Sequence, residues 1–290
     1  MPAGYQPGQA LSYKFGSLTH TDPAIRRQAI EHNLACIDAG KALGSKALTV
    51  WIADGANFPG QQDLSAAFDR YLDSLAVIYD SLPEAWQVFL EHKFYEPACY
   101  HTDIADWGMA YNLCMKLGPN AKVLVDLGHH AQGTNIEHIV AILLDEDRLG
   151  GFHFNDAKYG DDDLMVGSID PYQMFRITHE LINAMRDDDD PVAQKTAEDT
   201  VYMLDQCHNI EPKVPAIIRS VQSRTLPSLP VPVTGLTPQD ESSQLIKLME
   251  AMITCLESHR RDELDSSRSK QLHRFIKRMR KAGYDLKDIL

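Results

Sequence analysis

Residues 121–130 read AKVLVDLGHH, an unbroken apolar run that ends in an aspartate and, shortly after it, a pair of histidines. Such a run, without alternation between apolar and polar residues, is typical of a strand that is buried on both faces of a parallel sheet. Similar runs recur along the chain and alternate with amphipathic helical patterns, which predicts an α/β fold built on a parallel sheet. The predicted strands are 47–55, 86–94, 121–130, 151–156 and 201–209, and the predicted helices are 23–44, 63–82, 102–118, 135–150 and 171–186.

The start of the first helix is marked by the dipeptide Asp22-Pro23, an N-cap residue followed by a proline in the first turn. Residues 17–20 (SLTH) just before it are predicted to end a further extended stretch. Near the other end of the alternating region, residues 187–199 (DDDDPVAQKTAED) are predicted to be a polar excursion over the surface.

The composition changes after about residue 213, where the chain becomes rich in proline, serine and threonine. Two helical patterns follow at 243–259 and 266–283. We therefore expect one domain over residues 1–212 and, over residues 213–290, a Pro/Ser-rich segment followed by a helical C-terminal tail.

The bulk properties exclude several classes of partner. A formal net charge of −13 argues against nucleic acid, because phosphate backbones need a basic face. The most apolar run, 138–144, is too short to span a membrane. The five cysteines are scattered singly and no signal peptide is visible, so a cytoplasmic protein is expected.

Acidic and imidazole side chains follow each of four successive predicted strands. Because the carboxyl ends of parallel strands meet at one rim, these side chains are expected to lie together. A run such as Asp161–Asp163 is by itself usually a solvated face, but so many like charges in one place require a cation. The residues concerned are Glu91 and Lys93, then Asp126, His129 and His130, then His153, Asp156 and Asp161 to Asp163, and finally Asp205, Gln206 and His208.

Carboxylates with two imidazoles and no thiolate suit Mn²⁺, Mg²⁺ or Co²⁺ better than structural zinc. The candidate ligands exceed what one ion needs, which favours two divalent cations. Lys93 beside them is a charged donor suited to polarising a substrate oxygen. This combination fits the interconversion of aldoses and ketoses, and it equally fits epimerisation next to a carbonyl.

Five ordered blocks resemble the L-rhamnose isomerase family, in its broad-specificity pseudomonad-type branch. The blocks are TVWIADGANFPGQ (49–61), EHKFYEPA (91–98), VDLGHHA (125–131), GFHFNDAKYGDDDL (151–164) and DQCHN (205–209). The resemblance implies a TIM-type (β/α)₈ barrel. The first two β/α units have no counterpart in this chain, so the resemblance implies an open six-stranded remnant that starts at 17–20.

The resemblance also implies roles for individual residues. A first metal would be held by Glu91, Asp126, His153 and Asp205. A second metal would share Asp126 and add His129, Asp161 and Asp163, while Asp162 points away. Lys93, Trp51 and His129 would contact the sugar, and Lys93 and Asp205 would be catalytic, Asp205 by assisting proton movement.

The activity that this resemblance implies is a metal-dependent aldose–ketose isomerase, acting on L-rhamnose to give L-rhamnulose and on related sugars. Manganese is the expected metal and a homotetramer the expected assembly. A hydride shift and an enediol proton transfer both stay open. Two alternatives also stay open: a ketose epimerase, which would normally present a glutamate pair, and a truncated, non-catalytic paralogue that binds metal or sugar.

Overall fold

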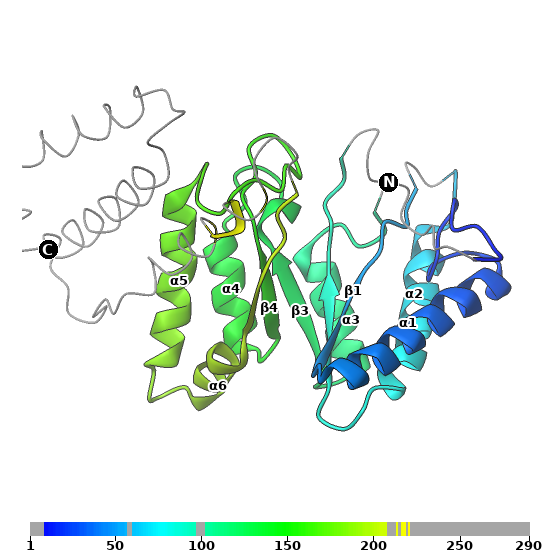
Figure 1. Ribbon diagram of the computed structural model, residues 1–290, viewed down its shortest axis with the longest axis horizontal. Helices are drawn as coiled ribbons and strands as arrows, with labels where there is room; N and C mark the ends of the chain where they lie inside the picture. The colour runs from blue at the N-terminus through cyan, green and yellow to red at the C-terminus, as the bar shows by residue number, and fades with distance from the viewer. Residues whose placement is uncertain are drawn as a thin grey trace, which may run out of the picture.

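The computed structural model describes residues 9–56, 60–96 and 102–207, together with residues 213, 216–218 and 220. In this part of the chain, strands and helices alternate as the apolar pattern predicts (Figure 1). The strands are β1 (Ala47–Trp51), β2 (Gln87–Glu91), β3 (Ala121–Asp126), β4 (Leu149–Phe154) and β5 (Val201–Leu204). The helices are α1 (Pro23–Leu43), α2 (Leu64–Asp80), α3 (Trp107–Leu117), α4 (Ile136–Asp145), α5 (Pro171–Met185) and α6 (Pro191–Asp199).

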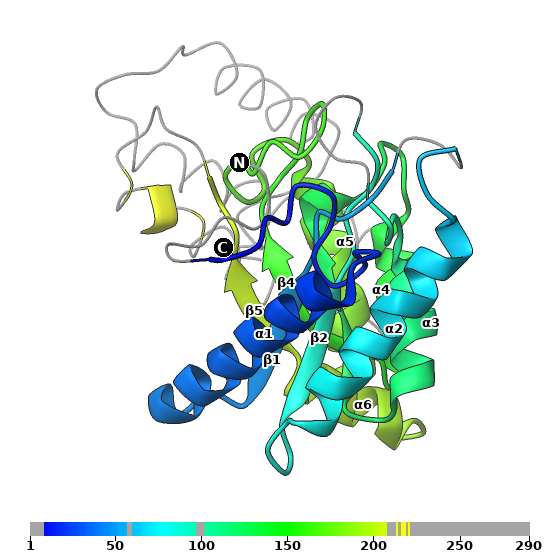
Figure 2. The ribbon, with the colours of Figure 1, turned by 90° about the vertical axis from the view of Figure 1, so that its right-hand side faces the viewer.

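The five strands form one parallel sheet in the order β1-β2-β3-β4-β5, so each strand pairs with its neighbour in the sequence. Figure 2 shows strands side by side with their arrows pointing the same way. Crossovers between parallel strands are right-handed, and a strand order that never reverses therefore puts all the connecting helices on one face. The carboxyl ends of all five strands meet at the opposite end of the sheet from the helix-to-strand turns.

Each α-helix begins after an aspartate or asparagine whose side chain accepts a backbone N–H from the first turn. Such caps satisfy donors that the helix itself leaves without partners. The predicted cap at Asp22 is confirmed, and Pro23 occupies the first turn. The same Asp-Pro pair opens α5 at Asp170 and α6 at Asp190.

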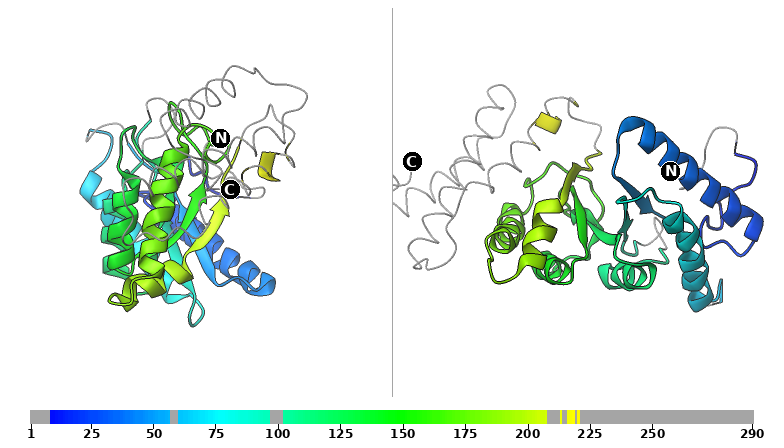
Figure 3. Two further views of the ribbon diagram at one scale, coloured as in Figure 1. Left: turned by 90° about the vertical axis from the view of Figure 1, so that its left-hand side faces the viewer. Right: turned by 90° about the horizontal axis from the view of Figure 1, so that it is seen from below.

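The main core lies between the sheet and the helices. Alternate strand residues point to the helix side, as with Val88 and Leu90 of β2 and Val123 and Val125 of β3, and all of these are buried. Figure 3 shows green helices packed on one side of the green and yellow strands. The strand residues between these apolar positions point to the other face, where the functional candidates lie.

Two predictions about the edges of this region are wrong. Residues 17–20 form turns, so the described part of the chain has five strands and not six. The Ser17 and Thr19 N–H groups, which a strand would offer to a neighbour, donate to the carboxylate of Asp54 at 2.6 and 3.0 Å. Residues 187–199 contain the helix α6, whose Ala193 and Ala197 pack into the core.

The strands also end earlier than predicted: β2, β3 and β5 end at Glu91, Asp126 and Leu204. The predicted tail at 213–290, with its two helical patterns, lies outside the described residues apart from a few positions before 221. The domain division at residue 212 therefore stays a prediction. Within the described part of the chain, no helix combines the length and apolarity needed to cross a membrane.

Candidate functional site

The first group of candidate ligands comes from four successive strand ends. Glu91 ends β2, Asp126 ends β3, His153 lies one residue before the end of β4, and Asp205 follows β5 directly. Parallel register places Asp126 opposite His153. One ligand atom from each of the four side chains lies within 4.8 Å of the others. The sequence prediction that these strand ends converge is confirmed.

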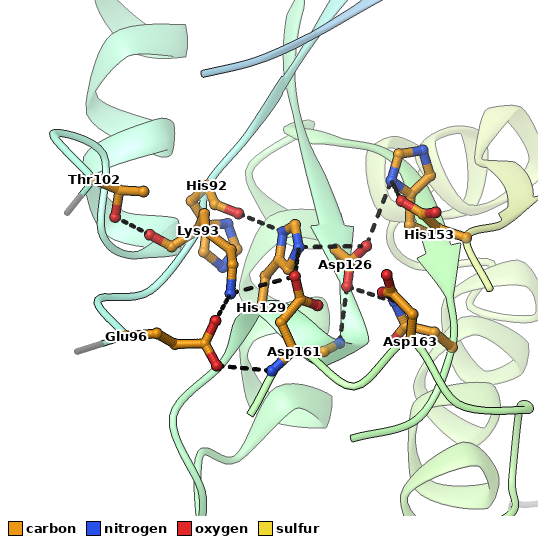
Figure 4. A network of polar contacts seen from close by, with 12 residues as sticks. His92, Lys93, Glu96, Thr102, Asp126, His129, His153, Asp161 and Asp163 are labelled. Carbon is orange, nitrogen blue, oxygen red and sulfur yellow. Dashed lines mark hydrogen bonds and ion pairs between the residues drawn. The ribbon is translucent and has the colours of Figure 1, made fainter. Parts of the chain in front are cut away.

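A second group shares Asp126 and adds His129 and Asp161, again with ligand atoms within 4.8 Å of one another. His129 lies in a short 3₁₀ turn (Leu127–His129) directly after β3, and Asp161 lies in the loop after β4. His129 Nε2 is 3.3 Å from Asp161 Oδ2 (Figure 4). His129 Nδ1 is 3.2 Å from Glu91 Oε1. The two groups are therefore adjacent and overlap at Asp126.

Asp126 is fully buried, and its two carboxylate oxygens have different surroundings. Oδ1 accepts hydrogen bonds from the Gly128 N–H at 2.8 Å and from Asn155 Nδ2 at 2.9 Å. Oδ2 has no hydrogen-bond partner among the described residues, and neither has the buried Oδ1 of Asp161. Buried carboxylate oxygens without a hydrogen bond are costly, and a divalent cation would remove that cost. The donor set of carboxylates and imidazoles suits a hard or borderline ion.

The pKa values of the two histidines also indicate that the cluster requires positive charge. Burial alone would lower the pKa of His129, but the carboxylates of Asp161 and Glu91 outweigh it and raise that pKa to about 11. Burial likewise opposes the charged form of His153, yet Asp126 and Glu91 raise its pKa to about 10. In the chain as it stands, two imidazolium groups thus supply positive charge where a cation would do so.

Asp163 is the predicted ligand that the structure leaves outside both groups. Burial, followed by repulsion from Asp161 and Asp205, raises the pKa of Asp163 to about 8. Its Oδ1 lies 3.3 Å from Asn155 Nδ2, so it is near the cluster without joining it. Asp162 bonds within its own loop, where its carboxylate accepts the N–H groups of Lys158 and Tyr159 at 2.6 and 2.7 Å.

Lys93 lies at the edge of the second group, and its side chain is completely buried. Its Nζ is 2.6 Å from Glu96 Oε2 and 3.4 Å from Asp161 Oδ2 (Figure 4). Glu96 also accepts the backbone N–H of Asp161 at 2.9 Å, so it connects the lysine to the acidic loop. Sequence reasoning missed Glu96, although a lysine beside a predicted metal site calls for a counterion and EHKFYEP offers one at the third residue after it.

The remaining predicted residues are placed as follows. Trp51 ends β1 and pairs in register with Glu91, so it belongs to the same rim. His130 belongs to neither ligand group, and its ring packs edge-on against the buried His92, with ring centroids 4.7 Å apart. Asp156 is buried, and its carboxylate accepts the N–H groups of Ala157, Ile169 and Asp170. His208 lies outside the described residues.

Residues 5–203 match the xylose isomerase-like TIM barrel family. The chain belongs to this family. The predicted barrel-type fold is confirmed, with the five-stranded parallel sheet as part of such a barrel. The resemblance to L-rhamnose isomerases is confirmed at the level of this wider family.

Two curated relatives are identical to this chain at more than half of the aligned positions. A probable sugar isomerase of Rhizobium meliloti (strain 1021) is 56% identical over 214 residues, covering 74% of this chain and 48% of that protein. A probable sugar isomerase of Mesorhizobium japonicum is 54% identical over 212 residues, covering 73% and 48%. The chain thus spans about half the length of the curated relatives it matches.

Solved structures share the fold at low identity. A D-tagatose 3-epimerase-like protein has a TM-score of 0.53 at 13% identity, covering 73% of each chain. A protein of Sinorhizobium meliloti 1021 has a TM-score of 0.51 at 17% identity, covering 73% of this chain and 74% of that one. At this level of identity the similarity concerns the fold alone.

Proposed function

We propose that this chain carries the metal centre of an aldose–ketose isomerase whose substrates are L-rhamnose and related aldoses. The observation that carries the proposal is the pair of ligand groups that overlap at Asp126, with the buried Lys93 at their edge. The two relatives described as probable sugar isomerases support the reaction class. The choice of L-rhamnose rests on the sequence blocks alone.

The residues divide into ligands and substrate-facing groups. Glu91, Asp126, His153 and Asp205 would hold one divalent cation, for which we propose Mn²⁺. Asp126, His129 and Asp161 would hold a second, with Asp163 as a further ligand once it turns toward it. When bound, such cations supply positive charge that polarises the hydroxyl and carbonyl oxygens of a sugar.

Conversion of an aldose to a ketose moves one hydrogen from C2 to C1 and one proton from the C2 hydroxyl to the C1 oxygen. Lys93, held by Glu96 and Asp161, would donate a hydrogen bond to a substrate oxygen near these carbons. Asp205 has a side chain that is 47% exposed, whereas Glu91 and Asp126 are buried. It is therefore the ligand with room to contact a hydroxyl proton. Trp51 would pack against the apolar face of the sugar.

A direct test is turnover by the purified chain after treatment with a chelator, with L-rhamnose and a panel of aldoses, with and without Mn²⁺. We expect ketose to form only with the metal, and Asp126→Asn to abolish both metal binding and turnover. Asp188→Asn is the matched control, because Asp188 is an exposed member of another aspartate run. Metal binding without turnover would overturn the proposed activity and favour a non-catalytic protein that binds metal.

The same assay separates the isomerase from the epimerase. An epimerase would convert one ketose to another and leave aldoses unchanged. The fold similarity to a D-tagatose 3-epimerase-like protein keeps this reaction in the test. Lys93 beside the acidic cluster favours the isomerase, since it offers a donor to the oxygen that gains or loses a proton. Assembly into a homotetramer remains a proposal, and size-exclusion chromatography with light scattering tests it.

A further inference from the structure

Asn155 is a buried amide, 1% exposed, in the position directly after β4. Its Nδ2 lies 2.9 Å from Asp126 Oδ1 and 3.3 Å from Asp163 Oδ1. The amide nitrogen has two N–H groups and both neighbours are carboxylate oxygens, so one amide donates to two acids. Neither Asn155 nor any contact of it was predicted from the sequence.

The position of this amide determines which oxygen of Asp126 is left for a ligand. Oδ1 already receives the Gly128 N–H and the Asn155 N–H, which together fix the rotation of the carboxylate. Oδ2 is then left without a hydrogen bond among the described residues, 3.5 Å from His153 Nδ1 and 4.0 Å from His129 Nε2. Those two imidazoles belong to the two different ligand groups. The oxygen that Asn155 leaves available is therefore the one between them.

The second N–H of the amide acts on the loop after β4. Asp163 is the predicted ligand that stands outside the groups, and its side chain accepts a hydrogen bond from Asn155 Nδ2. Asn155 thus links the end of β3 to the acidic loop through two carboxylates. Loss of the amide would release Asp126 to rotate and Asp163 to move away.

We propose that Asn155 is a positioning residue of a site for two cations. It holds Oδ1 of Asp126 in a hydrogen bond, and Oδ2 is thereby left to bind the metals. The inference rests on the proposed metal centre. It makes a specific statement about the two sites: the one that includes Asp161 and Asp163 depends on Asn155 more than the one that includes Glu91 and Asp205. Removing a hydrogen-bond partner of a metal ligand typically lowers metal affinity by about 10–100-fold.

The test is titration of the metal-free chain with Mn²⁺, followed by calorimetry, which needs no turnover. We expect the wild-type chain to bind two ions and Asn155→Leu to bind the weaker ion about 10–100-fold less tightly. Leucine has the same number of side-chain heavy atoms and the same branching as asparagine, and it has no donor. Asn155→Ala is the second variant, and Asn33→Leu is the matched control, because Asn33 Nδ2 donates to the Ala29 carbonyl within its own helix.

Each outcome bears on one statement. No Mn²⁺ binding by the wild-type chain would overturn the proposed metal centre itself. Two ions bound equally well by the wild-type chain and both Asn155 variants would leave the centre standing and overturn the role of Asn155. If circular dichroism shows that both variants lose the fold while Asn33→Leu keeps it, Asn155 serves stability and the inference is again wrong.

Discussion

The pair Lys93–Glu96 allows the effect of burial on an ion pair to be measured inside one chain. Lys93 is 0% exposed and Glu96 is 18% exposed, and their charged atoms are 2.6 Å apart. An ion pair of the same sequence spacing, Asp38–Lys41, lies on α1 with its atoms 3.0 Å apart, and its side chains are 77% and 49% exposed. The two pairs differ in their contact with water and in the additional contacts that Lys93 and Glu96 make with Asp161.

We predict that Glu96→Gln lowers the free energy of unfolding of the metal-free chain far more than Asp38→Asn does. Removing one partner of a buried pair costs about 3–5 kcal/mol, because the remaining charge stays buried. Lys93 keeps Asp161 at 3.4 Å, and the glutamine oxygen still accepts a hydrogen bond, so we expect roughly 2–3 kcal/mol, just below that range. An exposed pair contributes about 0.2–1 kcal/mol.

The assay is urea denaturation in the presence of a chelator, followed by circular dichroism. A shift of the midpoint without a change of slope would report stability alone. High salt should reduce the small effect at Asp38 and leave the effect at Glu96 nearly unchanged, because water and ions screen exposed charges much more. Equal shifts for the two variants would refute the reasoning that burial sets the energy of the Lys93 pair.

Three further predictions concern the site and the core. Mn²⁺ affinity should rise with pH up to about pH 11, because protons compete for His129 and His153, whose pKa values are raised to about 11 and about 10. Calorimetry at several pH values measures this rise. Asp156→Asn should destabilise the chain by about 1–3 kcal/mol in urea unfolding, since its carboxylate accepts the Ile169 N–H at 2.6 Å in a buried position. Gly150→Ala should cost about 1–3 kcal/mol in thermal unfolding, because the added carbon would lie 2.5 Å from a ring atom of Phe89.

The parallel sheet and the convergence of its strand ends were predictable because both depend on local pattern. Unbroken apolar runs identified β2, β3 and β4, and an acid or imidazole at the end of each run identified the rim. The helix α6 was missed because its sequence is mostly polar. It begins with Asp190-Pro191, the same capping pair as Asp22-Pro23 at the start of α1. This capping pair indicated a helix, but the preceding run of aspartates favoured an exposed polar segment.

The supporting residues were not predictable, because their roles arise from contacts between distant parts of the chain. Glu96 meets Asp161 across 65 residues of sequence, and Asn155 meets Asp126 across 29. Residues 17–20 look extended in sequence, yet Asp54 accepts the N–H groups of Ser17 and Thr19 from 37 and 35 residues away. Periodicity reports which face of an element is apolar, and it does not report which carboxylate a buried amide or lysine will meet.

The sequential strand order has a consequence for how the chain is made. Because every strand pairs with the one that precedes it in sequence, each new unit can add to an edge that has already formed as synthesis proceeds. The first ligand group takes one residue from each of four such additions, beginning at Glu91 and ending at Asp205. A nascent chain therefore lacks the full ligand set until its last described strand has docked. A cation bound there would then close the loop between the first and last of these units, and their separation would require its release.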